Sequence, residues 1–493
     1  MTKCTDKIYV VITSEGGGGH LVAAKNIKDQ LKAAENNCAI ETFTVLSEEE
    51  KTSLRIGNMD FGQQGVKGWN YSQKNDSCIH KIFATQWALG LTNYMFGSVF
   101  EKDLSTSLEN IQKQHKGKEI IILDCQPLFT LATLNTIKKL NIKSYKKVLT
   151  DCPEQAVHFM QQLEKIKPEN YKEQSITIEM LQDPSQKNNI QYAKHFLGNL
   201  FAQNEQPYSN ITFEFTEGPI KKHVSKTNKE KGVNTYSIML GSQASNDILL
   251  YIEALTQKTI KDPTQQFTLN VFCGNNDQLK QSIYKMHNTN NLKINAYGFV
   301  SNDFVLDTYA KSNSIIIRPG GLSVMEALHI CRNTDKKVYV TENFSTQWEK
   351  GNYEHLKKAL ATQVELCSPN TIFSPPLQQQ HSINKAIIVV LLNIIIVLLT
   401  IMAISLIVAN PFFTINIQVA RIILCIAVVL VYIYSAKIDT AKPIIINDNK
   451  MTVKTPPLTQ QQIKKINSDL APRQRQGLKP CLMLGQKQKL TRT

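Results

Sequence analysis

Two stretches in the second half of the sequence place small residues and a carboxylate where a phosphate ligand could bind. LGSQAS (240–245) and RPGGLSVMEAL (318–328) each follow an apolar run and open a helical pattern. Free N–H groups at a helix start favour a phosphate. Glu326 lies one turn inside the second helix, where its carboxylate could accept hydrogen bonds from vicinal hydroxyls. The pattern predicts a nucleotide diphosphate, bound by Gly241, Ser242, Gly320, Gly321 and Ser323.

A third stretch, TSEGGGGHLVAA (13–24), places four glycines before His20. Gly17, Gly18 and Gly19 would let the backbone approach a ligand closely, and the histidine would stand at the start of a helix. The spacing is not that of a dinucleotide fingerprint, and no phosphate-loop lysine follows. A tight turn with a solvated histidine is the alternative interpretation.

Short apolar runs that alternate with helical patterns must position these residues. Continuous β-branched runs between helices are typical of a parallel sheet buried on both faces. In the first half the predicted strands are 7–13, 119–125 and 146–151. After a lysine-rich stretch that resembles a linker (221–232), they are 235–240, 267–273, 293–300, 314–319 and 336–341.

This alternation predicts an α/β protein with two Rossmann-like, doubly wound domains, 1–225 and 226–370. Ligands of such sheets gather at the carboxyl ends of the strands, where all three stretches lie. Residues 55–100 depart from the pattern because aromatics occur there among lysines and glycines: Trp69, Tyr71, Phe83, Trp87, Tyr94, Phe96 and Phe100. They suit either a membrane interface or acceptor groove, or the core of two helices.

Two apolar runs near the carboxyl end, 386–409 and 415–434, are each long enough to cross a bilayer. Their short connection predicts a transmembrane helical hairpin (385–436). No signal-peptide core precedes the first strand, so the large N-terminal part is expected to stay on the cytosolic side. Buried core helices are the alternative, but core helices rarely lack a polar face for so long.

The remaining tail, 437–493, carries 12 Lys and Arg against three Asp. A basic far end places both ends of the hairpin in the cytosol, and the tail near an anionic membrane surface. Its composition also fits a disordered segment. No nucleic-acid motif accompanies the charge, so no nucleic-acid partner is expected. The ten cysteines form no CxxC pair, which suits a reducing compartment.

Three blocks, GGGGHLVAA, RPGGLSVMEAL and TQWEKGNYEHL (346–356), resemble the signature blocks of lipid-acceptor glycosyltransferases with two Rossmann domains (the GT-B fold). That family includes monogalactosyldiacylglycerol synthase, processive diacylglycerol glucosyltransferases and the N-acetylglucosaminyltransferase of lipid II synthesis. Smaller similarities occur in order between the blocks, over residues 8–365: Trp69-Asn70, the strand end VLTD with His158 downstream, GPI (218–220), FCGNN (272–276) and YGFV (297–300).

The resemblance implies a role for each matching residue. Gly17, Gly18, Gly19, Trp69 and His158 would lie on the acceptor side. The nucleotide-sugar would be bound by Gly241, Ser242, Arg318, Gly320, Gly321, Leu322, Ser323 and, at the ribose, Glu326. Gln347, Glu349 and Asn352 would contact the donor sugar. The glycine-poor 240–245 loop and the bulky Trp348 depart from the family pattern.

The resemblance also implies the chemistry. An acceptor hydroxyl would attack the anomeric carbon of a UDP-sugar while UDP leaves, usually with inversion. His20 would act as the general base or orient the acceptor. Asp151 is a second candidate base, with a helix N-cap before Pro153 as the equally good alternative. The UDP-sugar is a co-substrate, and no metal or other cofactor is expected because helix N-termini offset the diphosphate charge.

Taken together, the sequence predicts a membrane-anchored hexosyltransferase that acts on a lipid-type acceptor such as diacylglycerol. The hairpin would raise the effective concentration of a membrane acceptor. Three alternatives stay open. The acceptor could be a polysaccharide intermediate or a protein, or the chain could be a non-catalytic membrane protein that uses the fold for binding.

Overall fold

The computed structural model describes residues 6–373 except 17, 36–37, 48–51, 53, 57, 76–85, 155–156, 221–232, 287–290, 343 and 345. Both sheets lie in one compact unit, residues 1–432. The predicted linker, the hairpin at 385–436 and the basic tail at 437–493 lie outside the described residues. Within the described part, no helix has both the length and the apolar character needed to cross a bilayer.

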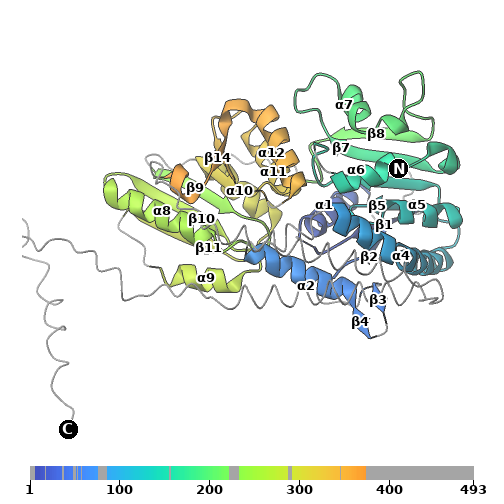
Figure 1. Cartoon of the computed structure of the whole chain (residues 1–493), viewed down its shortest axis with the longest axis horizontal. Helices are drawn as coiled ribbons and strands as arrows, with labels where there is room; N and C mark the ends of the chain where they lie inside the picture. Colours follow the sequence, from blue (N-terminus) through green and yellow to red (C-terminus); the bar gives the residue numbers. More distant parts are fainter. Residues whose placement is uncertain are drawn as a thin grey trace, which may run out of the picture. The chain divides into compact units, whose positions relative to one another are not determined.

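The first half forms a six-stranded parallel sheet with the order β2-β1-β5-β6-β7-β8. Its strands are β1 (Lys7–Thr13), β2 (Ala39–Thr44), β5 (Glu119–Asp124), β6 (Ser144–Val148), β7 (Ser175–Leu181) and β8 (Ile211–Thr216). The helices are α1 (Gly19–Ala34), α2 (Phe61–Lys74), α4 (Gln86–Gln114), α5 (Thr130–Lys139), α6 (Val157–Glu164) and α7 (Asn189–Phe196), with 3-10 turns at Pro168–Tyr171 and Gly198–Leu200. A small hairpin, β3 (Arg55–Ile56) and β4 (Met59–Asp60), precedes α2 (Figure 1).

The second half forms another six-stranded parallel sheet with the order β11-β10-β9-β12-β13-β14. Its strands are β9 (Val233–Met239), β10 (Gln266–Phe272), β11 (Leu292–Tyr297), β12 (Ser314–Ile317), β13 (Lys337–Thr341) and β14 (Val364–Cys367). The helices are α8 (Ile248–Lys261), α9 (Asp277–Tyr284), α10 (Asn302–Lys311), α11 (Gly321–Cys331), α12 (Gln347–Leu360) and α13 (Pro369–Ile372), with a 3-10 turn at Ala361–Gln363.

Both faces of each sheet are buried, as continuous apolar strands require. Along β1, Ile8 and Ile12 enter the core cluster under α4 and α5, whereas Tyr9 and Val11 enter the smaller cluster that contains Ala24 of α1. The second sheet likewise has separate clusters on its two sides. The prediction of two doubly wound parallel sheets is confirmed. Strands β2, β7, β8 and β14 and the β3–β4 hairpin were not predicted, and β6 lies at Ser144–Val148 rather than at 146–151.

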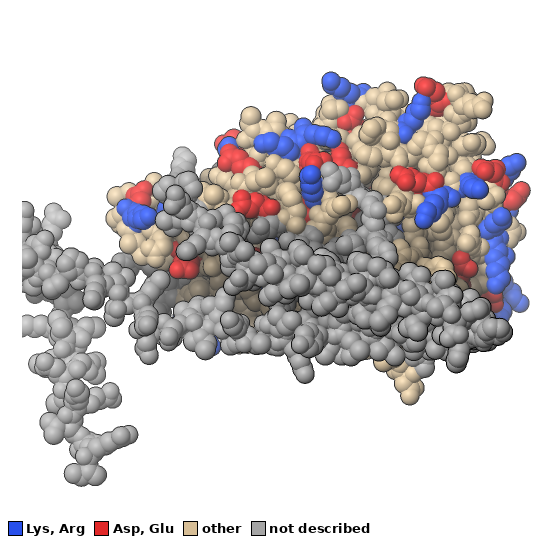
Figure 2. All heavy atoms as spheres, viewed as in Figure 1, with Lys and Arg blue, Asp and Glu red and all other residues tan. Residues whose placement is uncertain are grey.

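The aromatic residues of 55–100 divide between the two alternatives. Phe96 and Phe100 of α4 are buried in the first core, where Phe100 stacks on Phe129. Tyr71 and Tyr94 are exposed. On the described part of the face in Figure 2, basic and acidic side chains are interspersed.

Candidate active site

The loops at the reversal of strand order in each sheet contain most of the predicted site residues. The order reverses between β1 and β5 in the first sheet, and between β9 and β12 in the second. Ligands of open α/β sheets bind beyond the carboxyl ends of the strands at such points. The chain reaches His20 just after β1, Gly241 and Ser242 after β9, and Arg318 after β12. The motifs therefore occupy both of the positions that this rule favours.

Gly18 contacts the loop after β9. Its φ of +76° lies in the left-handed region, and a Cβ there would stand 2.5 Å from Oγ of Ser242. Glycine is thus required on both counts. A Cβ on Gly274 would likewise stand 1.9 Å from the Ser242 carbonyl oxygen. Ser242 is therefore packed between two glycines, one from each sheet's half. Gly17 lies outside the described residues.

The residues around Ser242 do not open a helix as the sequence suggested. Gly241 has a φ of +87°, and α8 begins only at Ile248. The intervening residues form turns because a left-handed residue breaks the helical path. By contrast, α1 begins at Gly19 with His20 in its first turn, and α11 begins at Gly321 with Gly320 as its N-cap, as predicted.

His20 is held as a neutral imidazole. Its Nδ1 lies 2.9 Å from Oγ1 of Thr150. Burial lowers the pKa of His20 to about 4, and the charge of Lys147 adds to this, while a hydrogen bond to the backbone of Cys125 opposes it. Neutral imidazole is the form that can accept a proton near pH 7.

A buried ion pair that the sequence analysis missed lies close to His20. Nζ of Lys147 stands 3.1 Å from Oδ2 of Asp124, with 2% and 0% of the two side chains exposed. The Tyr145 hydroxyl donates to the same oxygen at 2.7 Å. The available signal was the lysine pair Lys146 and Lys147 inside a strand that follows one ending in aspartate. The two charges act on the imidazole in opposite directions, since Lys147 lowers the pKa of His20 and Asp124 raises it.

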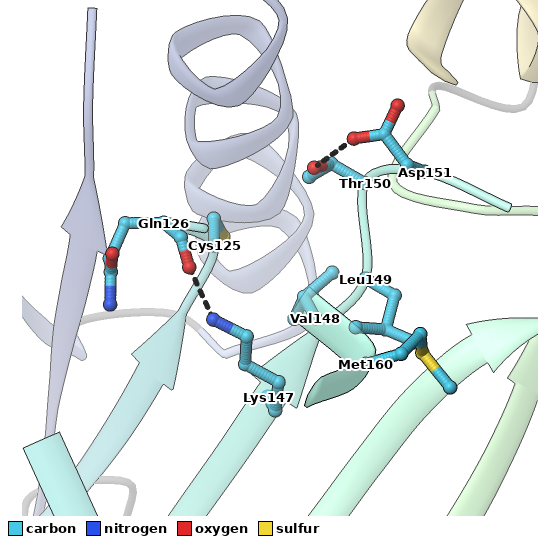
Figure 3. A pocket seen from close by; sticks show the side chains of 8 residues that line it. All are labelled: Cys125, Gln126, Lys147, Val148, Leu149, Thr150, Asp151 and Met160. Atoms are coloured by element: carbon cyan, nitrogen blue, oxygen red, sulfur yellow. Dashed lines mark hydrogen bonds between the residues drawn. The ribbon is translucent and has the colours of Figure 1, made fainter. Parts of the chain in front are cut away.

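A small cavity of about 10 Å³ opens at the ends of β5 and β6 (Figure 3). Cys125, Gln126, Lys147, Thr150 and Asp151 line it, with Val148, Leu149 and Met160. The Lys147 ammonium points to the carbonyl of Gln126, and the Thr150 hydroxyl points to the Asp151 carboxylate (Figure 3). The volume suits about one water molecule.

Asp151 lies three residues beyond β6 and reaches the second half of the chain. It accepts a hydrogen bond from the backbone of Gly321, the first residue of α11. A Cβ on Gly321 would stand 1.8 Å from the Thr150 carbonyl oxygen, so the two segments pack directly together. Burial raises the pKa of Asp151 although its hydrogen bonds oppose the shift. The carboxylate supplies the N-terminal partner that α11 lacks, since Gly320 has no capping side chain.

Asn352 joins the same two segments. Its Nδ2 donates to Oδ1 of Asp151 at 2.9 Å and to the carbonyl of Pro319 at 3.0 Å. Its Oδ1 accepts from the backbone N–H of Cys152 at 2.8 Å. The side chain is fully buried and uses both donors and its acceptor. In this arrangement Asn352 clamps the β6 loop to the β12 loop; its predicted sugar contact stays a prediction.

Glu349 is engaged with protein groups. Its Oε1 accepts from Nε of Arg318 at 2.6 Å, and both side chains are buried. The carboxylate also forms a capping box with Thr346 at the start of α12. Gln347, the first residue of α12, is exposed. The indole of Trp348 stacks on Trp69 of α2, with ring centroids 6.2 Å apart and 21° between the planes.

Glu326 has an unpaired buried oxygen. Its Oε1 accepts from Nδ2 of Asn302, but Oε2 has no hydrogen-bond partner among the described residues. Oδ1 of Asn302 and the hydroxyl of Tyr309 are unpaired as well. Burial raises the pKa of Glu326 to about 8. Unpaired buried polar atoms are rare in native proteins, and a ligand with hydroxyl groups would satisfy these.

The remaining predicted residues are less informative. Leu322 packs against the second core, and Ser323 is buried in the first turn of α11. His158 belongs to α6, but its side chain lies outside the described part of the molecule. Potential metal-ligating atoms converge within the described residues at Cys152, Glu154 and His355.

Several solved structures are similar to this chain. SnogD, a glycosyltransferase from Streptomyces nogalater, has 11% sequence identity and a TM-score of 0.44, and the match covers 74% of this chain and 88% of that one. MurG from Acinetobacter baumannii has 14% identity, a TM-score of 0.37 and coverages of 74% and 86%. UGT89C1 from Arabidopsis thaliana, solved with UDP-L-rhamnose, has 11% identity, a TM-score of 0.41 and coverages of 74% and 85%.

No family model and no curated protein matches the sequence. The architecture itself follows from the strand order. Counted along the chain, the second sheet has the Rossmann order 3-2-1-4-5-6, and the first has 2-1-3-4-5-6. The chain therefore has two parallel Rossmann-like sheets, as the sequence predicts.

Proposed function

We propose that the protein is a glycosyltransferase that moves a hexosyl group from a UDP-sugar to a lipid-type acceptor such as diacylglycerol. The unpaired Oε2 of Glu326 carries this proposal. It lies one turn into a helix that begins at a strand-order reversal, where a nucleotide would bind. Two neighbouring hydroxyls of a ribose would donate to the Glu326 carboxylate.

Contacts between the two halves support a reaction between ligands held by each. Gly18 packs against Ser242, and Asp151 contacts Gly321, so an acceptor near the first loop would lie beside a donor near the second. The turn at Gly241 and the start of α11 would stabilise the charge that develops on the leaving diphosphate. Gly320 to Ser323 supply the first turn of that helix.

The proposed reaction is a displacement at the anomeric carbon. The acceptor oxygen forms a bond to that carbon while the bond to the diphosphate oxygen breaks, and UDP leaves. The neutral imidazole of His20 takes the acceptor's proton. The Thr150 hydroxyl, 2.9 Å from Nδ1, fixes the orientation of the ring. Inversion is the usual outcome in the family that the three sequence blocks resemble, and we propose it here.

Exposed apolar groups support a lipid-type acceptor and a membrane location. Met59, Tyr71 and Tyr94 are 53%, 37% and 68% exposed, and they lie in or next to α2 and α4 of the acceptor half. Aromatic side chains suit the headgroup level of a membrane. We propose that the apolar runs 386–409 and 415–434 anchor the protein, with the basic tail 437–493 on the same cytosolic face as the sheets.

A binding experiment followed by a transfer experiment tests the function. The full-length protein, purified in detergent, is titrated calorimetrically with UDP, alongside Glu326→Ala. The wild type should bind UDP, and the variant should bind at least about tenfold more weakly, since it loses the carboxyl group that would accept hydrogen bonds from the ribose hydroxyls. Incubation with labelled UDP-sugars and total lipid then identifies the sugar and the acceptor.

The outcomes separate the alternatives. Absence of measurable UDP binding by the intact protein would contradict the enzyme assignment. Binding without transfer to any lipid, polysaccharide or protein acceptor would favour the non-catalytic role instead. If the labelled sugar enters protein or polysaccharide but not lipid, the transferase assignment stands and only the proposed acceptor changes.

A further inference from the structure

Three buried side chains with metal-binding atoms meet where the two halves of the chain touch. Cys152 and Glu154 follow β6 in the first half, and His355 belongs to α12 in the second. Their exposed fractions are 0%, 4% and 2%. One donor atom from each lies within 4.8 Å of the other two. We call these residues the Cys152–Glu154–His355 cluster.

Neighbouring groups fix the cluster's orientation. Nδ1 of His355 stands 3.1 Å from Oε2 of Glu154 and 3.1 Å from the Tyr192 hydroxyl. One turn earlier on α12, Asn352 accepts from the backbone N–H of Cys152 at 2.8 Å. Tyr192 is thus a partner of the His355 imidazole from outside the cluster, and partners of this kind orient metal-ligating histidines.

The spacing is close to that of a tetrahedral site. Zinc lies about 2.3 Å from a cysteine sulfur and about 2.0–2.1 Å from imidazole nitrogen or carboxylate oxygen. Tetrahedral angles then place the donors roughly 3.5 Å from one another. The three donor atoms lie within 4.8 Å of one another, so side-chain movements of about 1 Å would bring them to the tetrahedral spacing.

The charges also match a divalent cation. A thiolate and a carboxylate carry two negative charges, and a neutral imidazole adds none, so one divalent cation balances the three ligands. The half-exposed ammonium of Lys358 lies 3.6 Å from Oε1 of Glu154, at the edge of the cluster. Isolated buried charges are strongly unfavourable, and this balance removes them. On binding, the Cys152 thiol would release its proton to solvent. Burial and the nearby Glu154 raise the pKa of the unbound thiol, which keeps it protonated without a cation.

We propose that Cys152, Glu154 and His355 bind one zinc-type divalent cation that ties the β6 loop to α12. A sulfur, nitrogen and oxygen donor set favours zinc over the hard cations magnesium and calcium, which prefer oxygen alone. A second cavity of about 10 Å³, lined by His355 with Glu217, His329 and Arg332, leaves room for a water as the fourth ligand. The role is structural, and it does not depend on the proposed transferase activity.

Cobalt titration of the full-length protein tests the site. The protein is first dialysed against a chelator, and Co²⁺ is then added while thiolate-to-cobalt charge-transfer absorption is recorded in the near ultraviolet. We expect one equivalent to bind with this absorption, and added Zn²⁺ to displace it. Cys152→Ser should abolish the absorption, and His355→Gln should weaken binding at least about tenfold. Cys331→Ser, which changes a buried cysteine of α11 outside the cluster, is the matched control.

The cobalt titration of the wild type is sufficient to contradict the proposal, without any variant. If saturating Co²⁺ gives no thiolate absorption in the wild type, the cluster does not bind the cation. Absorption that persists in folded Cys152→Ser would place the metal elsewhere. If circular dichroism shows that Cys152→Ser does not fold, Glu154→Gln is titrated in its place. An unchanged Co²⁺ affinity in Glu154→Gln would also contradict the site. UDP affinity measured on the same samples separates this result from the proposed function.

Discussion

The Asn352 amide of α12 donates to the Asp151 carboxylate of the first half at 2.9 Å, across 201 positions of sequence. This one side chain also bonds Cys152 and Pro319. We expect Asn352→Ala to lower the free energy of unfolding by about 2–4 kcal/mol, because it leaves several buried polar groups unpaired. Urea unfolding of the full-length protein measures the change.

Asn234→Ala is the matched control for that prediction. Among the described residues its amide donates only to the exposed side chain of Gln265, so its loss should change the stability by less than about 0.5 kcal/mol. Equal effects of the two substitutions would show that the Asn352 bonds contribute nothing particular to the contact.

Replacement of His20 should separate donor binding from transfer. His20→Ala should retain UDP affinity and lower kcat about 10²–10⁴-fold, the usual contribution of a general base. Because the pKa of His20 is lowered to about 4, the wild-type rate should fall only when the pH approaches 4. If His20→Ala no longer binds UDP, His20 takes part in binding the donor and is not the general base.

The raised pKa of Glu326 predicts a pH dependence of UDP affinity. The carboxyl is protonated below about pH 8, and hydroxyl donors favour its ionised form. The affinity should therefore rise up to about tenfold between pH 7 and pH 9. Glu326→Gln, which cannot ionise, should bind weakly with little change over this range. An equally steep dependence in that variant would assign the titration to another group.

The Glu326 carboxyl also makes the free energy of unfolding depend on pH when no ligand is bound. Its pKa rises from 4.5 in the unfolded chain to about 8 in the folded one, so ionisation opposes folding. Stability should fall as the pH rises through this window, by up to about 4 kcal/mol. Thermal unfolding at pH 5 and pH 8 should show a smaller fall in Glu326→Gln than in the wild type.

Gly18 and Gly19 offer a test of the loop contact. Gly18→Ala should destabilise the contact with Ser242, because its φ is positive and its Cβ would stand 2.5 Å from Oγ. The backbone strain alone is on the order of 1 kcal/mol. Gly19→Ala, whose Cβ meets nothing within 4 Å, should retain wild-type stability and UDP affinity. Similar behaviour of the two variants would contradict the packing.

The sequence predicted the layers of the fold better than the contacts of the site. Apolar strands such as Lys7–Thr13 are recognisable because both faces are buried. Strand β2 was missed since it has no continuous apolar run and no residue buried along it. The helix expected at Gly241 fails for a local reason, the left-handed backbone of that glycine.

Partners distant in sequence could not be predicted. The sequence around Glu349 does not distinguish a carboxylate that contacts a sugar from one that pairs with Arg318. The fold brings Arg318 to Glu349, and this ion pair is seen only in the structure. The Lys147–Asp124 pair likewise depends on the pairing of β5 with β6. The spacing of the motifs predicted the loops of the site. The hydrogen bonds between the two halves could be identified only from the three-dimensional structure.

The stacked indoles of Trp69 and Trp348 give the protein an intrinsic optical reporter. The chain has only three tryptophans, and these two belong to opposite halves with their rings 6.2 Å apart. Indole emission is sensitive to the polarity and contacts of the ring, so any change in the separation of α2 and α12 alters the fluorescence. Ligand-induced motion of the halves can therefore be followed in real time without a label.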